Sequence, residues 1–253
     1  MQKSTNFVQK THTHHTDMKK KYTDLFIDFD DTLYDTRGNA DIALRELYDL
    51  YRWSQNIDDP ERFYARYWET NIDLWSRYAQ GEISRQYLII ERFRRPLSIA
   101  HGLDLSEAYC LEVSDTFLDL CSSKSGVIKG AHQLIAYLRQ QGYRLHLCSN
   151  GFHEVQYKKL AACGMRDSFD TIILSEDAGA NKPSKQYFDY ALTQSHATRE
   201  TTLMIGDNLQ TDILGAKHAG IDTLYFNPQH TEAHTTESPT YQVHSLTQIT
   251  GIL

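Results

Sequence analysis

Three of four consecutive residues are aspartates at the end of an apolar segment near the N-terminus. The segment spans 25–29 and contains Asp28, which is followed by Asp30 and Asp31. Carboxylates crowded against an apolar segment cost stability unless a cation or a proton compensates them. A carboxylate can attack phosphorus when a metal ion offsets the repulsion between two anions, and Asp28 suits this role. A carboxyl two residues later can protonate the leaving oxygen and then accept a proton from water, which suits Asp30.

Three further polar motifs follow later apolar segments. The Ser149 hydroxyl and the backbone N–H groups beside it, with Asn150, can face a phosphate, although Ser and Asn are also ordinary helix caps. Lys182 can balance phosphate charge and hold the nucleophile, or can be a solvated surface charge. Asp207 can complete an oxygen-ligand set for Mg²⁺, with Asp212 orienting it, or can cap a helix.

Each motif follows a segment with the composition of a buried strand. The predicted strands are 25–29, 144–148, 171–174, 202–205 and 223–226. Segments with helical spacing alternate with them, at 130–141, 152–162, 185–194 and 209–219. This alternation predicts an α/β fold with a Rossmann-like parallel sheet and helices on both faces. Ligands bind at the carboxyl ends of the strands in such sheets, so we expect the four motifs to meet in one crevice.

The stretch from 38 to 122 has a different character. Strand signals vanish there and apolar residues recur every three or four positions, which predicts an inserted cap of four helices. Its aromatic residues are most simply the core of that bundle, although one or two could reach a substrate. The predicted catalytic core comprises 21–37 and 123–253, and the polar residues 1–20 are predicted to form a disordered tail.

The overall composition limits the partners. Of the 253 residues, 40% are hydrophobic and 23% charged, as in ordinary soluble proteins, and the net charge of −7 disfavours a general grip on nucleic acid. No apolar run approaches the ~18 to 20 residues of a membrane span. The four cysteines form no Cys-x-x-Cys pair. We expect a cytoplasmic protein, monomeric or weakly dimeric, whose partner is a small phosphorylated metabolite.

Taken together, the motifs resemble the hallmark of the haloacid dehalogenase superfamily. The matching residues are Asp-x-Asp-x-Thr at 28–32, Ser149, Lys182, and Gly-Asp-x-x-x-x-Asp at 206–212. The resemblance implies that Asp28 forms an aspartyl phosphate and binds Mg²⁺, and that Asp30 acts as acid/base and lends its backbone carbonyl to the metal. It also implies that Asp207 is the remaining protein ligand and that Thr32 braces the loop. Superfamily members that cleave carbon–halogen bonds lack the second aspartate, so Asp30 favours phosphate chemistry.

Within the superfamily, the cap run from Asn71 to Phe93 and the sequence Ser-Asn-Gly-Phe at 149–152 resemble the pyrimidine 5′-nucleotidase branch. That resemblance implies a substrate such as UMP, dUMP or dTMP. We therefore expect the cap loop around Gly81 to descend toward the nucleophile, and Trp75 or Tyr78 to help enclose the base.

Alternative functions remain open at this point. A sugar-phosphate phosphatase, of the phosphoglycolate type, or a phosphosugar mutase would use the same chemistry on another substrate. A signalling receiver also phosphorylates an Asp at a sheet edge, but the long insert and Asp30 argue against it. An inactive binding protein is disfavoured because both Asp28 and Asp30 are present.

Overall fold

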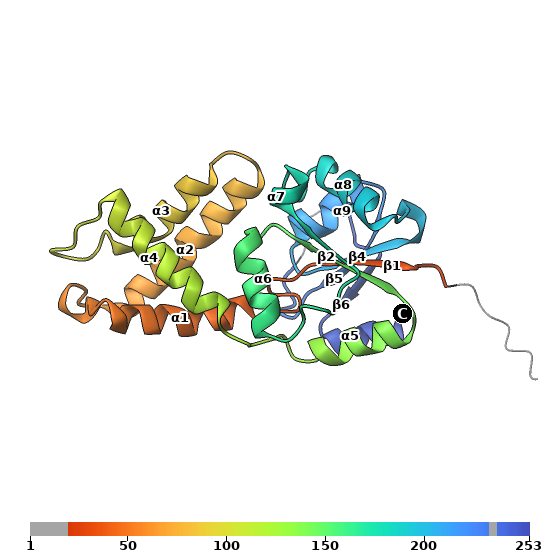
Figure 1. Cartoon of the computed structure of the whole chain (residues 1–253), viewed down its shortest axis with the longest axis horizontal. Coiled ribbons are helices and arrows are strands. Elements are labelled where there is room, and N and C mark those ends of the chain that lie inside the picture. The colour runs from red at the N-terminus through yellow and green to blue at the C-terminus, as the bar shows by residue number, and fades with distance from the viewer. Residues whose placement is uncertain (1–19, 233–236) are drawn as a thin grey trace, which may run out of the picture.

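A computed structural model describes residues 20–232 and 237–253, so most of the predicted tail at 1–20 lies outside the described residues. A six-stranded parallel sheet has the strand order β3-β2-β1-β4-β5-β6 and lies in the right-hand part of the molecule in Figure 1. The strands are β1 (Asp24–Ile27), β2 (Arg144–Ser149), β3 (Thr171–Leu174), β4 (Thr202–Gly206), β5 (Asp222–Phe226) and β6 (Tyr241–Val243). The predicted α/β fold is confirmed. Strand β6 was not predicted, because three residues at a sheet edge carry too little apolar pattern.

The register explains why the motifs converge. Ile27, the last residue of β1, pairs with Leu147 of β2 on one side and with Ile205 of β4 on the other. The backbone N–H of Asp28 continues the ladder to the carbonyl of Ile205 at 2.9 Å. Residues that follow these three neighbouring strands therefore emerge side by side at one edge of the sheet.

Helices cover both faces of the sheet, as predicted. They are α5 (Ala131–Gln140), α6 (His153–Ala162), α7 (Ser175–Ala178), α8 (Lys185–Ser195) and α9 (Gly215–His218), with short turns η2 (Arg199–Thr201), η3 (Leu209–Leu214) and η4 (Leu246–Gly251). Leu25 and Ile27 belong to the apolar cluster that includes α5, whereas Phe26 points to the opposite face and packs with α8 and α9. Alternate residues of a strand face opposite sides, which produces this division.

The segment 209–219, predicted to be one α-helix, is regular only in its last part. Its first part is the π-helical turn η3, and only 215–218 are α-helical. The Asn208 side chain accepts hydrogen bonds from the N–H groups of Gln210 and Thr211, and Asp212 accepts from the N–H of Asn208 at 3.1 Å. These side chains satisfy backbone groups that a regular helix leaves unpaired, so the irregular turn is stabilised locally.

Four helices form the inserted unit, at the left of Figure 1. They are α1 (Thr36–Leu50), α2 (Pro60–Ala79), α3 (Arg85–Leu97) and α4 (Glu107–Ser122), with the short turn η1 (Trp53–Gln55) between the first two. Each begins at a side chain that accepts a backbone N–H: Asp35, Asp59, Ser84 and Ser106. Most aromatic residues of this unit belong to its own apolar cluster, in which Trp53, Phe63 and Tyr67 are buried and others are partly buried.

In the described ranges, 20–232 and 237–253, no helix combines the length and the apolar character that crossing a membrane requires.

Candidate active site

The predicted nucleophile lies in a chain of charges at the carboxyl edge of the sheet. Lys182 Nζ is 2.7 Å from Asp28 Oδ1 and 2.7 Å from Asp212 Oδ1, and it donates a third hydrogen bond to the carbonyl of Cys148 at 2.8 Å. The Lys182 side chain is only 2% exposed. All three of its hydrogens thus have partners, which fixes the ammonium group beside Asp28.

Asp207 joins this group through Thr32. The fully buried Thr32 hydroxyl lies 3.1 Å from Asp28 Oδ2 and 3.0 Å from Asp207 Oδ1, and it accepts the backbone N–H of Asp207 at 3.1 Å. Thr32 therefore joins the loop after β1 to the loop after β4. Gly206 leaves room for the Asp212 side chain beside this loop, because a Cβ at position 206 would lie 2.3 Å from a carboxylate oxygen of Asp212.

The electrostatics of this cluster favour a cation. Burial, together with the neighbouring carboxylates of Asp212 and Asp30, raises the pKa of Asp28 to about 7 despite the contact with Lys182. Burial, followed by the charge of Asp28, raises the pKa of Asp207 well above its usual range. Carboxylate oxygens of Asp28, Asp207 and Asp212 lie within 4.8 Å of one another. Two buried carboxylates and a half-buried one leave excess negative charge beside a single lysine, and hard oxygen donors of this kind fit Mg²⁺.

Asn150 holds the lysine loop. Its amide nitrogen donates to the carbonyl of Lys182 at 2.9 Å, and its amide oxygen accepts the Lys182 backbone N–H at 2.8 Å. The side chain predicted to bind phosphate is thus used to fix the backbone of Lys182. Phosphate binding by Asn150 stays a prediction.

Asp30 lies in a separate group of contacts. Its Oδ1 accepts from the Thr36 hydroxyl and from Lys159 Nζ, and its Oδ2 accepts from Gln156 Nε2 at 2.6 Å. Burial alone would raise the pKa of Asp30, but the charge of Lys159 and these hydrogen bonds outweigh it and hold the pKa below its usual value. Gln156 Nε2 also lies 3.1 Å from Ser149 Oγ, so Asp30 and the predicted phosphate-binding hydroxyl share a neighbour.

Sequence reasoning missed Gln156 and Lys159. Both are buried on α6, where Val155 and Leu160 also face inward. The only sequence signal is their spacing of three, which places two polar residues on the helix face that the apolar residues mark as buried. Polar residues in a helix of this kind usually belong to its solvated face.

The predicted substrate residues of the cap meet the core near the second motif. Trp75 and Tyr78 pack on Phe152, with ring centroids at 5.3 and 6.0 Å. The carbonyl of Tyr78 accepts a hydrogen bond from Asn181, the residue before the catalytic lysine candidate, at 2.8 Å. Gly81 is exposed, and a Cβ at its position would have no atom within 4 Å. The roles of these three residues in binding a base stay predictions.

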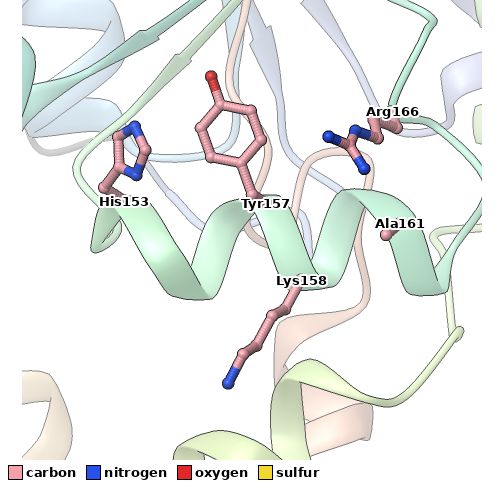
Figure 2. A pocket seen from close by; sticks show the side chains of 5 residues that line it. All are labelled: His153, Tyr157, Lys158, Ala161 and Arg166. Atoms are coloured by element: carbon pink, nitrogen blue, oxygen red, sulfur yellow. The ribbon is translucent and has the colours of Figure 1, made fainter.

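A surface hollow lies elsewhere, on the outer side of α6. Its volume is about 500 Å³, and Figure 2 shows the residues that line it, His153, Tyr157, Lys158, Ala161 and Arg166. None of them belongs to the acidic group. The spacing of four between His153, Tyr157 and Ala161 places them on the helix face opposite the buried one.

The architecture defines a class before any relative is considered: a parallel α/β fold with a group of carboxylates where its central strands end and a four-helix insert after β1. The family of haloacid dehalogenase-like hydrolases matches residues 25–220, and the chain belongs to this family. The predicted family and the prediction of a hydrolytic enzyme are confirmed.

The relatives include nucleotidases and other phosphatases. The chain is 32% identical to the pyrimidine 5′-nucleotidase PynA of Streptococcus pneumoniae, over 88% of this chain and 92% of that protein. It is 30% identical to the pyrimidine 5′-nucleotidase YjjG of Escherichia coli, over 92% of this chain and 98% of that protein. A glyceraldehyde 3-phosphate phosphatase of Methanothermobacter thermautotrophicus is 28% identical, over 83% of this chain and 87% of that protein.

A solved structure shows the same architecture. The crystal structure of the HAD-hydrolase YfnB from Bacillus subtilis bound to magnesium superposes with a TM-score of 0.82 at 31% identity, covering 92% of this chain and 99% of that chain. That structure of YfnB reveals interdomain movement.

Proposed function

We propose that this protein is a Mg²⁺-dependent phosphomonoesterase that works through an aspartyl phosphate and acts on pyrimidine nucleoside 5′-monophosphates. The observation that carries the chemistry is the buried contact between Asp28 and Lys182, which lies within a group of three carboxylates. The nucleotidases PynA and YjjG, which align over most of the chain, support the substrate class.

In the proposed reaction, an Asp28 carboxylate oxygen attacks phosphorus, and the bond from phosphorus to the ester oxygen breaks. In its protonated form, Asp30 gives a proton to the leaving nucleoside oxygen, and the contacts that hold the pKa of Asp30 low favour the carboxylate that results. A water molecule then attacks the phosphorus of the aspartyl phosphate and gives a proton to Asp30, releasing inorganic phosphate and free Asp28. The Ser149 hydroxyl donates to a phosphoryl oxygen, and the positive charge of Lys182, held beside Asp28 by its three hydrogen bonds, offsets the negative charge of the phosphoryl group.

The metal would be held by Asp28, Asp207 and the backbone carbonyl of Asp30. When bound, Mg²⁺ supplies the positive charge that lets a carboxylate approach a phosphate dianion. Asp212 supports the same geometry indirectly, because it binds Lys182.

The proposal includes the arrangement of the whole chain. Residues 38–122 act as the cap, over a core made of 21–37 and 123–253, in a cytoplasmic monomer or weak homodimer. The four helices α1 to α4 support this division, because they pack around an apolar cluster of their own.

The test is phosphate release with Mg²⁺ across a panel of nucleoside monophosphates and sugar phosphates. UMP, dUMP and dTMP should have the highest kcat/KM, and Asp28→Asn should lower kcat by roughly 10⁴-fold or more while leaving the protein folded. Asp58→Asn, in an exposed cap loop, is the matched control. If no ester is hydrolysed in the presence of Mg²⁺, the enzyme proposal is wrong.

The second candidate is a sugar-phosphate phosphatase. The similarity to a glyceraldehyde 3-phosphate phosphatase favours it, because that relative also aligns over most of its length. A preference for sugar phosphates in the same panel would keep the mechanism and replace the substrate.

A further inference from the structure

Two buried polar side chains of α6 have no part in the mechanism above. Gln156 is 1% exposed and Lys159 is 6% exposed, and both reach toward the site from one turn of the helix. Burying an amide and an ammonium group costs free energy unless each has good partners. Their partners are Asp30 and Ser149, which have proposed roles in the reaction.

The Asp30 carboxylate is fixed on both oxygens. Oδ1 receives the Lys159 ammonium and the Thr36 hydroxyl, and Oδ2 receives the Gln156 amide. Donors from two different elements, α1 and α6, thus converge on one carboxylate. Its orientation is set by these contacts, since a carboxylate held by several donors loses the freedom to rotate.

The Ser149 hydroxyl is fixed by the same amide. Its oxygen accepts the backbone N–H of Gly151 at 3.0 Å and lies 3.1 Å from Gln156 Nε2. With both lone pairs used, the remaining hydrogen of the hydroxyl is free to be donated to a phosphoryl oxygen. Gly151 leaves room for this arrangement, because a Cβ there would lie 1.6 Å from Gln156 Nε2.

The orientation of the Gln156 amide follows from these two contacts. An amide nitrogen has two hydrogens, and here each has an acceptor, one on Asp30 and one on Ser149. Gln156 Oε1 is buried and has no hydrogen-bond partner in the part of the chain that the structure describes. An arrangement that leaves an acceptor unpaired costs stability, so packing alone does not explain this residue.

We infer that Gln156 and Lys159 are positioning residues: Gln156 aligns the phosphate-binding hydroxyl of Ser149 with the acid/base Asp30, and Lys159 anchors the Asp30 carboxylate. This inference rests on the proposed phosphatase function. It separates two parts of the reaction, because Asp30 matters only where an oxygen needs a proton or a water must lose one. A leaving group that departs as a stable anion does not need Asp30.

The experiment compares two esters with different leaving groups. UMP releases an alkoxide that needs a proton, whereas p-nitrophenyl phosphate releases a stable phenolate. The variants are Lys159→Met and Gln156→Met, and the matched control is Lys158→Met, a neighbouring exposed lysine of the same helix that Figure 2 shows on its surface. Steady-state kinetics with UMP and stopped-flow release of p-nitrophenolate are measured with Mg²⁺.

Lys159→Met should lower kcat for UMP by roughly 10- to 100-fold with KM nearly unchanged. The first turnover of p-nitrophenyl phosphate should stay within about threefold of wild type, followed by slow steady turnover as the aspartyl phosphate accumulates. Gln156→Met should show the same pattern and also raise KM, because Ser149 loses its alignment. Lys158→Met should behave as wild type.

Coupling to Asp30 gives a second readout. If Lys159 acts through Asp30, Lys159→Met in an Asp30→Asn background should cause almost no further loss of UMP turnover, since interacting residues are not additive. If the role of Lys159 were purely structural, Lys159→Met would lower UMP turnover by the same factor in the wild-type and Asp30→Asn backgrounds. Should Lys159→Met fail to fold in a thermal melt, Lys159→Gln, which keeps a donor without the charge, takes its place in both measurements.

The outcomes separate the two proposals. The positioning roles would be wrong if the variants lowered kcat for UMP and the rate of the first p-nitrophenyl phosphate turnover by the same factor. They would also be wrong if both variants had wild-type kinetics. Neither result would contradict the phosphatase proposal. A wild-type protein that hydrolyses neither ester would instead overturn the proposed function, and the positioning roles with it.

Discussion

The core and the cap approach each other with very different surfaces. On the core side, Asp28, Lys182 and Asp212 form a buried network of charges, in which each hydrogen of the Lys182 ammonium group is donated to an acceptor. On the cap side, an apolar cluster joins Leu74 and Leu88 to Phe152 and Val155 of the core, and half-buried rings pack against it. The site thus combines a charged network in the core with an apolar, aromatic contact between core and cap, which we call the aromatic wall.

This difference separates two tasks. The charged groups can act on a phosphoryl group in any ester, because the phosphate is common to all of them. Apolar and aromatic surface can recognise only the part of the substrate that differs from one ester to another. Changes in the core should therefore affect all substrates alike, and changes in the cap should alter preference.

The largest expected effect comes from the metal site. Asp207→Asn keeps the size of the side chain and its hydrogen bond to Thr32 but removes a negative charge next to Asp28. We expect kcat to fall by roughly 10²- to 10³-fold for nucleotides and sugar phosphates alike, with weaker binding of Mg²⁺. Activity and isothermal titration with Mg²⁺ check this. A loss that depends on the substrate would contradict the division between core and cap.

A smaller effect is expected from pH. The pKa of Asp28 is about 7 in the folded protein, so the folded state binds more protons than the unfolded chain between about pH 4 and 7. The contribution of Asp28 to the free energy of unfolding therefore falls as the pH rises through this range. Mg²⁺ binds the deprotonated form, so its affinity should weaken by about tenfold per pH unit below 7.

Thermal melts with and without Mg²⁺ at about pH 6 and about pH 8 measure this linkage. The rise in Tm caused by Mg²⁺ should be larger at the higher pH. Asp28→Asn should reduce the pH dependence, and Asp207, whose pKa is also raised, should account for what remains. A wild-type response that is the same at both values would contradict the raised pKa of Asp28.

The sequence predicted the core because its motifs are local. Asp28 and Asp207 each follow an apolar strand directly, so strand order alone brings them together. The partners of Asp30 could not be predicted in this way. Gln156 and Lys159 lie within a helix, and their inward orientation depends on how α6 packs against the rest of the chain.

For the cap as well, the sequence predicted local structure but not the contacts with the rest of the chain. Periodicity predicted its helices, since apolar spacing is a property of each segment alone. It did not predict that Trp75 and Tyr78 leave the bundle core and pack on Phe152, more than 70 positions away in the sequence. Arg85 lies over the same ring, with its guanidinium carbon 4.2 Å from the ring centroid, and pairs with Glu176 of α7 at 2.8 Å. Contacts between units depend on tertiary structure that no local pattern encodes.

The smallest predicted effect tests the aromatic wall. Trp75→Leu removes the ring that packs on Phe152 but keeps an apolar side chain, and Tyr78 remains beside it. If the wall encloses the base, kcat/KM for UMP should fall by roughly fivefold, or about 1 kcal/mol, at the lower end of what a stacked ring contributes. Ribose 5-phosphate, which lacks a base, should be hydrolysed as by wild type.

The ratio of kcat/KM for the two substrates is the decisive quantity, because it cancels any general damage to the site. Trp68→Leu is the matched control, since Trp68 lies on the same helix but donates its ring N–H to Asp41 within the cap. It should leave the ratio unchanged. If Trp75→Leu lowers kcat/KM equally for both substrates, the ring supports cap closure and does not recognise the base. Selection between substrates would then have to come from other residues of the site.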